Sequence, residues 1–204
     1  LSGGKSDVYV LGSIHIADIS LYPLHRKIEE AFNRADYIVV EADVSNIQAA
    51  AAYMQQKAMY FDGTTIDKVL SEKTYKLYKE KVEAFGFDPN MYNILKPWYA
   101  AMLIQNLSLG EAQYSGGFGV DLYFLSRAMD KSILELEGVK FQVELFDNLS
   151  MEMQEMFLKD VLLSTQKDEE EKSISIEIMG NMLKAWKEGN VEELEKLIAL
   201  SNEA

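Results

Sequence analysis

The amino-acid sequence predicts an α/β protein with a small, mostly parallel sheet, βαβ units and a large helical insertion. Three short segments rich in apolar residues, at residues 8–11, 37–40 and 132–136, have the length and composition of strands. Between and after them, apolar residues recur at the spacing of amphipathic helices. A helix between two such strands implies a parallel pair joined by a right-handed crossover.

The length of 204 residues and the absence of an internal repeat predict one domain. We expect this domain to contain three parts. They are an α/β core at residues 1–44 and 117–147, a helical insertion at 45–116 and a helical segment at 148–204.

The first βαβ unit is expected over residues 8–41. Its first strand, residues 8–11, ends in a turn, and helical spacing follows over residues 19–35. Ser20 is the expected N-cap of this helix, and Pro23 suits its first turn. The second strand then ends at a glutamate, as the third strand does much later in the chain.

The insertion is expected to be helical over residues 45–61, 65–87 and 88–109. We expect a break near Ser71 and a kink or restart at Pro97, which cannot continue a helix from the preceding residue. This block is rich in Met, Tyr and Ala, a composition that more often forms core than a partner groove.

The chain returns to an α/β pattern with a helix at residues 120–129 before the third strand. Helical spacing then continues towards the C-terminus. The expected segments are residues 139–149, 150–168, 174–189 and 190–204.

The composition excludes several classes of function. Acidic residues outnumber basic ones 33 to 20, which gives a net charge of −13 and disfavours nucleic acid as a partner. The absence of cysteine excludes disulfides, thiolate nucleophiles and Cys-ligated zinc. The sequence contains no run of about 18 apolar residues, so it predicts no transmembrane segment in this chain.

A polar residue follows each predicted strand: His15, Glu41 and Glu137. Ligands of open α/β sheets bind beyond the carboxyl ends of the strands, so we expect one imidazole and two carboxylates to converge there. This set can bind Mn²⁺, Co²⁺ or Zn²⁺. It can equally activate a water without metal, with His15 as general base. We expect Gly12 to allow a close backbone approach or positive φ, and Ser13 to cap the turn or bind a ligand.

A set of short motifs, in order along nearly the whole chain, resembles the TraB/PrgY/GumN family, which includes the Tiki proteins. Each motif alone is short, but together they form an ordered series. The motifs are Gly12-Ser13-Ile14-His15, Pro23-Leu24, Glu41 with Asp43, Lys96-Pro97-Trp98, Gly119-Val120-Asp121, Leu136-Glu137 with Gln142, and the segment AWKEGNVEELEKL.

The resemblance implies a function. Tiki proteins are membrane-associated metalloproteases that clip the amino terminus of Wnt proteins, and bacterial members act in pheromone shutdown on a peptide. The wider superfamily includes erythromycin-esterase-like hydrolases and haem-binding ChaN-like proteins. By this resemblance His15, Glu41 and Glu137 are the candidate catalytic residues and metal ligands. Residues that would bind substrate or support those ligands are Gly12, Ser13, Asp43, Lys96, Asp121 and Gln142.

The resemblance also implies a longer protein. The family continues to a second Gly-x-x-His motif, which this sequence lacks, so we expect a C-terminal truncation without the last helix–strand unit. The opening LSGGKSD has no initiator Met, which predicts that a leader or membrane anchor has been removed. We therefore expect an extracytoplasmic or membrane-associated location. An unpaired sheet edge would favour a homodimer.

Three functional hypotheses follow. The first is a Tiki-like metallopeptidase that uses Mn²⁺, Co²⁺ or Zn²⁺ and acts on a peptide or the terminus of a protein. The second is a non-catalytic module that binds and sequesters a peptide, using the Met- and Tyr-rich block as an adaptable groove. The third is a haem carrier of the ChaN-like kind, with His15 as axial ligand.

Overall fold

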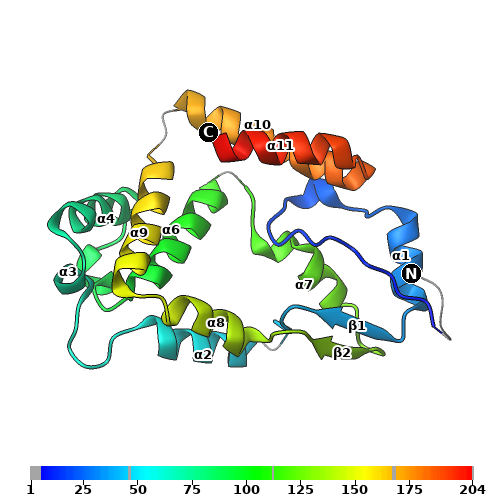
Figure 1. The fold of residues 1–204 in the computed structure, drawn as a ribbon, viewed down its shortest axis with the longest axis horizontal. Helices are drawn as coiled ribbons and strands as arrows, with labels where there is room; N and C mark the ends of the chain where they lie inside the picture. The colour runs from blue at the N-terminus through cyan, green and yellow to red at the C-terminus, as the bar shows by residue number, and fades with distance from the viewer. Residues whose placement is uncertain (1–5, 46, 112, 167–168, 204) are drawn as a thin grey trace. The chain divides into compact units, whose positions relative to one another are not determined.

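The computed structural model describes residues 6–45, 47–111, 113–166 and 169–203. This part of the chain is mostly helical, with a small two-stranded parallel sheet, so the predicted α/β class with a large helical part is confirmed. None of its helices is both long enough and apolar enough to cross a membrane. The chain divides into two compact units (Figure 1). Unit 1 is Leu1–Val40, Tyr114–Glu135 and Ser173–Ala204, and unit 2 is Glu41–Gln113 and Leu136–Lys172.

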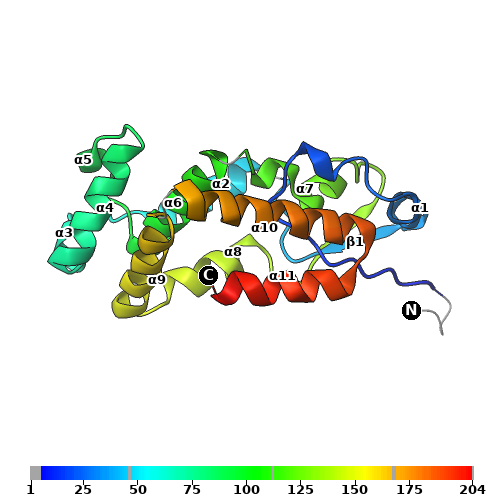
Figure 2. The ribbon, with the colours of Figure 1, turned by 90° about the horizontal axis from the view of Figure 1, so that it is seen from above.

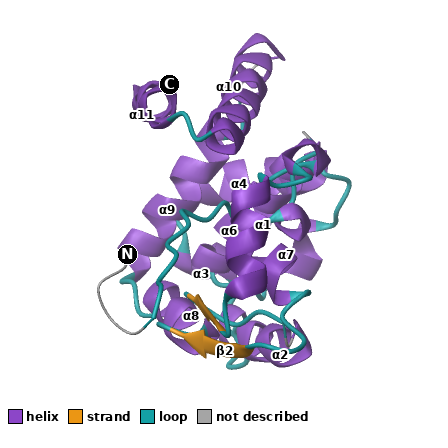
Figure 3. Ribbon diagram, turned by 90° about the vertical axis from the view of Figure 1, so that its right-hand side faces the viewer, coloured by secondary structure: helices purple, strands orange, loops and turns teal. Residues whose placement is uncertain are grey.

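The sheet of unit 1 consists of β1 (Tyr37–Val40) and β2 (Ser132–Glu135). The two strands lie side by side (Figure 3). They pair in parallel, in a register that places Tyr37 opposite Ser132 and Val40 opposite Glu135. Both strands were predicted within one residue of these bounds, and their parallel direction is confirmed. Each strand therefore ends at the same edge of the sheet.

The prediction of a strand at residues 8–11 is wrong. This segment has no regular structure, and its four apolar side chains are between 41% and 81% exposed. An apolar run has strand propensity, but a stable strand also needs a ladder partner and a surface that covers one of its faces. The first βαβ unit is consequently absent from the described residues.

Unit 1 also contains a shorter helix than the spacing at residues 19–35 predicts. Ser20 does not start a long helix: Asp18 caps a short 3-10 helix, and the α-helix begins only at Arg26, with His25 as its N-cap.

Figure 2 shows the last two helices of the chain, α10 and α11, running alongside each other. The helices of unit 1 are η1 (Ile19–Leu21), α1 (Arg26–Arg34), η2 (Gly116–Phe118), α7 (Val120–Leu125), α10 (Glu169–Glu188, from Ser173 onward) and α11 (Val191–Glu203).

The core of unit 1 joins α1 to α7. The rings of Phe32 and Phe124 lie 4.7 Å apart between their centroids. Glu29 of α1 accepts hydrogen bonds from the Tyr123 hydroxyl and the Arg127 guanidinium. These contacts fix α7, whose first turn carries Asp121.

Unit 2 contains the helical block that the sequence predicts. Pro97 starts a new helix, because the first helical position needs no amide N–H donor. The predicted break near Ser71 is also found, since Ser71 caps the next helix. The helices of unit 2 are α2 (Ile47–Ala58), α3 (Ile66–Val69), α4 (Glu72–Ala84), α5 (Pro89–Tyr92), α6 (Pro97–Glu111), α8 (Val139–Asp147) and α9 (Met151–Ser164).

The aromatic and aliphatic stripes of this block form the core of unit 2. Helices α6 and α9 pack along each other (Figure 1). Tyr78, Ile104 and Leu158 are buried at their interface with α4, and Trp98 is buried beside Ala58 and Val143. The interpretation of the block as core is therefore confirmed for Ala58, Tyr78, Trp98 and Ile104.

The cap of α4 links the helical packing to a carboxylate. The Ser71 hydroxyl accepts a hydrogen bond from the Thr74 amide, and Glu155 of α9 accepts bonds from the amide and hydroxyl of Ser71. Burial alone would raise the pKa of Glu155, but the hydrogen bonds from Ser71 and Thr74 outweigh it and lower the pKa below its ordinary value.

Replacing Ser71 with alanine should lower the free energy of unfolding by about 1–2 kcal/mol at neutral pH, because one cap and one carboxylate partner are lost. The folded pKa of Glu155 lies below its unfolded value, so the part of this stabilisation that comes from Glu155 is complete above the unfolded pKa and is lost as the pH falls through the folded pKa. Urea denaturation of both proteins across this acidic range measures the change.

Ser150 offers a matched control, because it caps α9 through the same type of bond to the Met153 amide. Ser150→Ala should cost about 1 kcal/mol. We expect a Ser71→Ala effect that shrinks more in acid than the Ser150→Ala effect. Equal pH dependence of the two would contradict the assigned role of Glu155.

Candidate functional site

The segment that carries His15 is held against the start of α7 by backbone hydrogen bonds within unit 1. Ala17 and Ser115 exchange two of them, with N···O distances of 3.2 and 2.9 Å. The Val120 amide donates to the Ile14 carbonyl at 2.8 Å. These bonds join two segments about 100 residues apart in the sequence and place the residues around His15 beside the first turn of α7.

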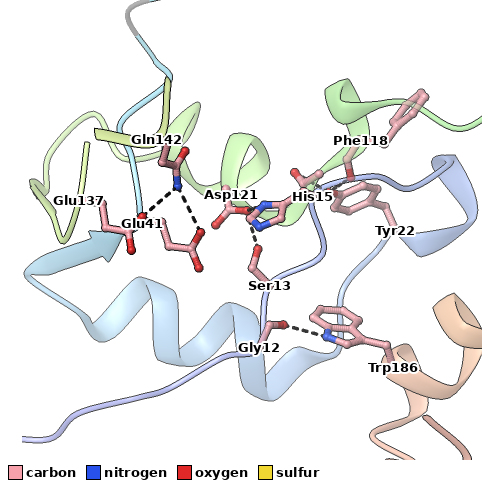
Figure 4. A network of polar contacts seen from close by, with 11 residues as sticks. Gly12, Ser13, His15, Tyr22, Glu41, Phe118, Asp121, Glu137, Gln142 and Trp186 are labelled. Carbon is pink, nitrogen blue, oxygen red and sulfur yellow. Dashed lines mark hydrogen bonds and ion pairs between the residues drawn. The ribbon is translucent and has the colours of Figure 1, made fainter. Parts of the chain in front are cut away.

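His15 and Asp121 form the most defined polar contact of this region (Figure 4). The His15 Nδ1 lies 2.7 Å from the Asp121 Oδ2, and the Ser13 hydroxyl donates to the same oxygen at 2.5 Å. The His15 side chain is 64% exposed and the Asp121 side chain 25%. Asp121 also lies in the first turn of a helix, where a negative charge is favourable.

The contact decides which ring nitrogen of His15 is reactive. A carboxylate can only accept hydrogen bonds, so Nδ1 carries a proton, and in the neutral ring Nε2 keeps its lone pair. A histidine oriented in this way can take a proton from water, as in hydrolytic triads, or bind a metal ion through Nε2. The structure thus brings together Ser13, His15 and Asp121, three of the predicted site residues.

Gly12 does not have the role expected from the sequence. Its φ is not in the left-handed region, and a Cβ added to it would meet no heavy atom within 4 Å. The prediction of a close approach or positive φ at Gly12 is therefore wrong. Instead, its carbonyl accepts a hydrogen bond of 2.8 Å from the Trp186 indole of α10 (Figure 4).

Glu41 and Glu137 form a second cluster, in unit 2. Glu41 directly follows β1, and its carbonyl accepts hydrogen bonds from the amides of Glu137 and Gly138 at 3.0 and 2.8 Å. Gly138 has a φ of 83°, a left-handed conformation that glycine adopts without a steric penalty, and it begins α8. This turn holds the two glutamates together where the paired strands end.

A single amide bridges the two carboxylates (Figure 4). The Gln142 Nε2 lies 3.5 Å from the Glu41 Oε2 and 3.4 Å from the Glu137 Oε2. Both glutamates are exposed. Two carboxylates that share one donor form a cluster of hard oxygen ligands, which suits a divalent cation.

The other predicted residues have local or separate contacts. Asp43 accepts a hydrogen bond from the Ser45 amide, which stabilises its own turn. The Lys96 ammonium pairs with Asp147, whose other oxygen lies 3.5 Å from the Lys57 ammonium. The side chains of Lys96 and Asp147 are only 22% and 10% exposed, so this pair lies within the packed interior of unit 2, between the start of α6 and the end of α8.

The donor chemistry of these residues fits a divalent ion, since a carboxylate-bonded imidazole and two carboxylates are typical ligands. Within the described residues, however, no group of three or more His, Cys, Asp or Glu is arranged to hold one. His15 belongs to unit 1 and the two glutamates to unit 2. Their predicted convergence on one ion stays a prediction.

Sequence reasoning missed two residues that touch the His15 segment. Trp186 lies in the segment AWKEGNVEELEKL and Gly119 in the Gly-x-Asp motif, so both residues could have been singled out from the motifs. Neither residue has a side chain of the kind usually considered for catalysis. Their contacts with Gly12 and His15 could be identified only once the fold was known.

Comparison with known proteins identifies relatives. The model of the TraB/PrgY/gumN family matches residues 1–204. The chain is similar to "Uncharacterized protein YbaP" of Escherichia coli (strain K12), with 24% identity over 142 residues, 69% of this chain and 52% of that protein. It is also similar to an "Uncharacterized protein" of Treponema pallidum (strain Nichols), with 20% identity over 144 residues, 69% of this chain and 43% of that protein. The chain thus spans about half the length of these curated relatives, and no solved structure matches it.

Proposed function

The chain belongs to the TraB/PrgY/gumN family, and from this premise we propose that it is a metal-dependent hydrolase that cleaves a peptide or the terminus of a protein. The observation that carries the proposal is the 2.7 Å contact between the His15 imidazole and the Asp121 carboxylate. The resemblance of the motifs around His15 to those of the Tiki metalloproteases agrees with it.

Asp121 is the orienting residue in this proposal. Its Oδ2 accepts the Nδ1–H of His15 and the hydroxyl of Ser13, which fixes the ring and its tautomer. The Nε2 of His15 is then a neutral donor for a metal ion or a base for water. Because the side chain is mostly exposed, a substrate can reach it directly.

Glu41 and Glu137 are the proposed carboxylate ligands, held in place by the amide of Gln142. Bound Mn²⁺ or a similar ion would lower the pKa of a water molecule and polarise the scissile carbonyl. A glutamate that does not bind the ion would accept the proton of the attacking water.

A metal-free hydrolase is the second candidate, favoured by the same contact. A histidine whose Nδ1 is bonded to a carboxylate can accept a proton from water without a metal ion. In that mechanism His15 is the general base, and a glutamate protonates the leaving group. Removal of metal ions separates the two candidates.

A peptide-library assay tests the proposal. The chain is incubated with a mixture of short peptides and with Mn²⁺ or EDTA, and the products are identified by mass spectrometry. We expect cleavage with Mn²⁺ and none with EDTA. Cleavage that resists EDTA would support the metal-free mechanism, and binding of peptides without any cleavage would overturn both and favour a sequestering module.

A further inference from the structure

Gly119 packs tightly against the backbone of His15. A Cβ added to Gly119 would lie 2.6 Å from the His15 carbonyl oxygen and 3.1 Å from the His15 carbonyl carbon. It would also lie 3.1 Å from the Gly116 carbonyl oxygen. All three neighbours are backbone atoms, which cannot rotate out of the way as a side chain can.

The reason for glycine at this position is space and not conformation. Its φ of −63° and ψ of 146° are extended values that any residue adopts. Gly119 is also the N-cap of α7, and its lack of a side chain leaves no capping hydrogen bond there. Serine or aspartate would be the better cap, so contact with His15 is the property that requires glycine.

The same contact sets the position of Asp121 relative to His15. Gly119 lies against the carbonyl of His15, the next residue donates its amide to Ile14 at 2.8 Å, and Asp121 follows one residue later. A displacement of α7 from the His15 segment would therefore move the Asp121 carboxylate away from the imidazole.

We propose that Gly119 is a positioning residue for His15: the missing side chain lets α7 approach the His15 backbone closely enough for Asp121 to hold Nδ1. This inference rests on the proposed function for its importance in catalysis, but its geometry can be tested without any substrate. In Gly119→Ala the two backbones must separate by several tenths of an ångström, which lengthens the 2.7 Å contact.

The test is the tautomer of His15, read from the ¹⁵N chemical shifts of its ring at a pH well above about 6.5, where an unrestrained imidazole is neutral. The wild-type chain should show Nδ1–H for His15. His25 should show the opposite, Nε2–H tautomer, because its Nδ1 accepts the Lys27 amide at 3.2 Å. The two histidines therefore serve as references for each other.

In Gly119→Ala we expect the His15 signals to shift away from those of the pure Nδ1–H tautomer, because the bond to Asp121 is weakened, while the His25 signals stay the same. Gly116→Ala is the matched control, since its Cβ would lie 3.7 Å from the same His15 oxygen, an ordinary van der Waals contact. The control should keep the wild-type His15 signals. A Gly119→Ala protein with wild-type His15 signals would overturn the inference.

A second measurement covers the case in which Gly119→Ala does not fold. In the wild-type chain, the Gly119 α protons should give nuclear Overhauser effects to the backbone of residues 15–16, and their absence would overturn the inference. Neither measurement depends on turnover. A wild-type chain with the expected tautomer but no hydrolysis of any peptide would therefore contradict the proposed function and leave the positioning role of Gly119 supported.

Discussion

Replacing His15 with alanine is expected to lower kcat/KM for peptide cleavage by a factor of about 10²–10⁴, the usual contribution of a positioned acid–base group. Without the imidazole, Asp121 has no base to orient. Among the described residues only the Ser13 hydroxyl would still bond its carboxylate. Stability should change by less than about 0.5 kcal/mol, because the side chain is mostly exposed. The peptide assay and urea denaturation measure the two effects.

His25→Ala is the control for this substitution. His25 is the other histidine of the chain, and its ring caps α1 through the Lys27 amide. We expect this variant to lose about 0.5–1 kcal/mol of stability and to keep its activity. If His15→Ala turned over peptide as fast as the wild-type chain, His15 would have no part in the chemistry.

The sequence predicted the paired strands well because their signals are local. The run at Tyr37–Val40 is short and apolar, and Ser132–Glu135 has apolar residues at its centre and polar residues at its ends, so the type and the bounds of both could be inferred from pattern alone. The restart at Pro97 and the cap at Ser71 are local in the same way, since each depends on the chemistry of one residue.

The errors arose where tertiary context decides the structure. Residues 8–11 have the composition of a strand, but pairing in a sheet depends on partners that no local pattern reveals. The helix expected from residue 19 begins only at Arg26. Asp18 caps a short 3-10 helix and His25 caps α1, so the segment forms two separate helices and not one continuous helix. The helical spacing of apolar residues alone could not show that two helices are present.

The sequence predicted which residues belong to the candidate site better than it predicted their contacts. His15 was chosen because it follows a predicted strand and lies in a motif, and Asp121 was chosen from a motif. Their hydrogen bond spans 106 residues and depends on the backbone bonds between the His15 segment and the start of α7. The reason assigned to Gly12 in fact applies to Gly119. A motif identifies where glycine occurs, but only the neighbouring atoms explain why.

The carboxylate pair leads to the second large expected effect. Glu41→Gln combined with Glu137→Gln keeps the size of both side chains but removes both charges, so Mn²⁺ should no longer bind measurably by titration calorimetry. Gln142→Leu should weaken binding by about 10–100-fold, as is usual when a residue that orients a metal ligand is lost. Two carboxylates that share one amide repel each other, and a bound cation would remove that repulsion.

Glu135→Gln is the matched control, because Glu135 is an exposed glutamate at the end of β2, two residues before Glu137. It should retain the wild-type affinity, which would show that the position of a charge matters and not the net charge of the chain. Unchanged Mn²⁺ affinity in the double variant would remove both glutamates from the metal site. The ion would then bind through other residues, with the Nε2 of His15, oriented by Asp121, as the remaining proposed ligand.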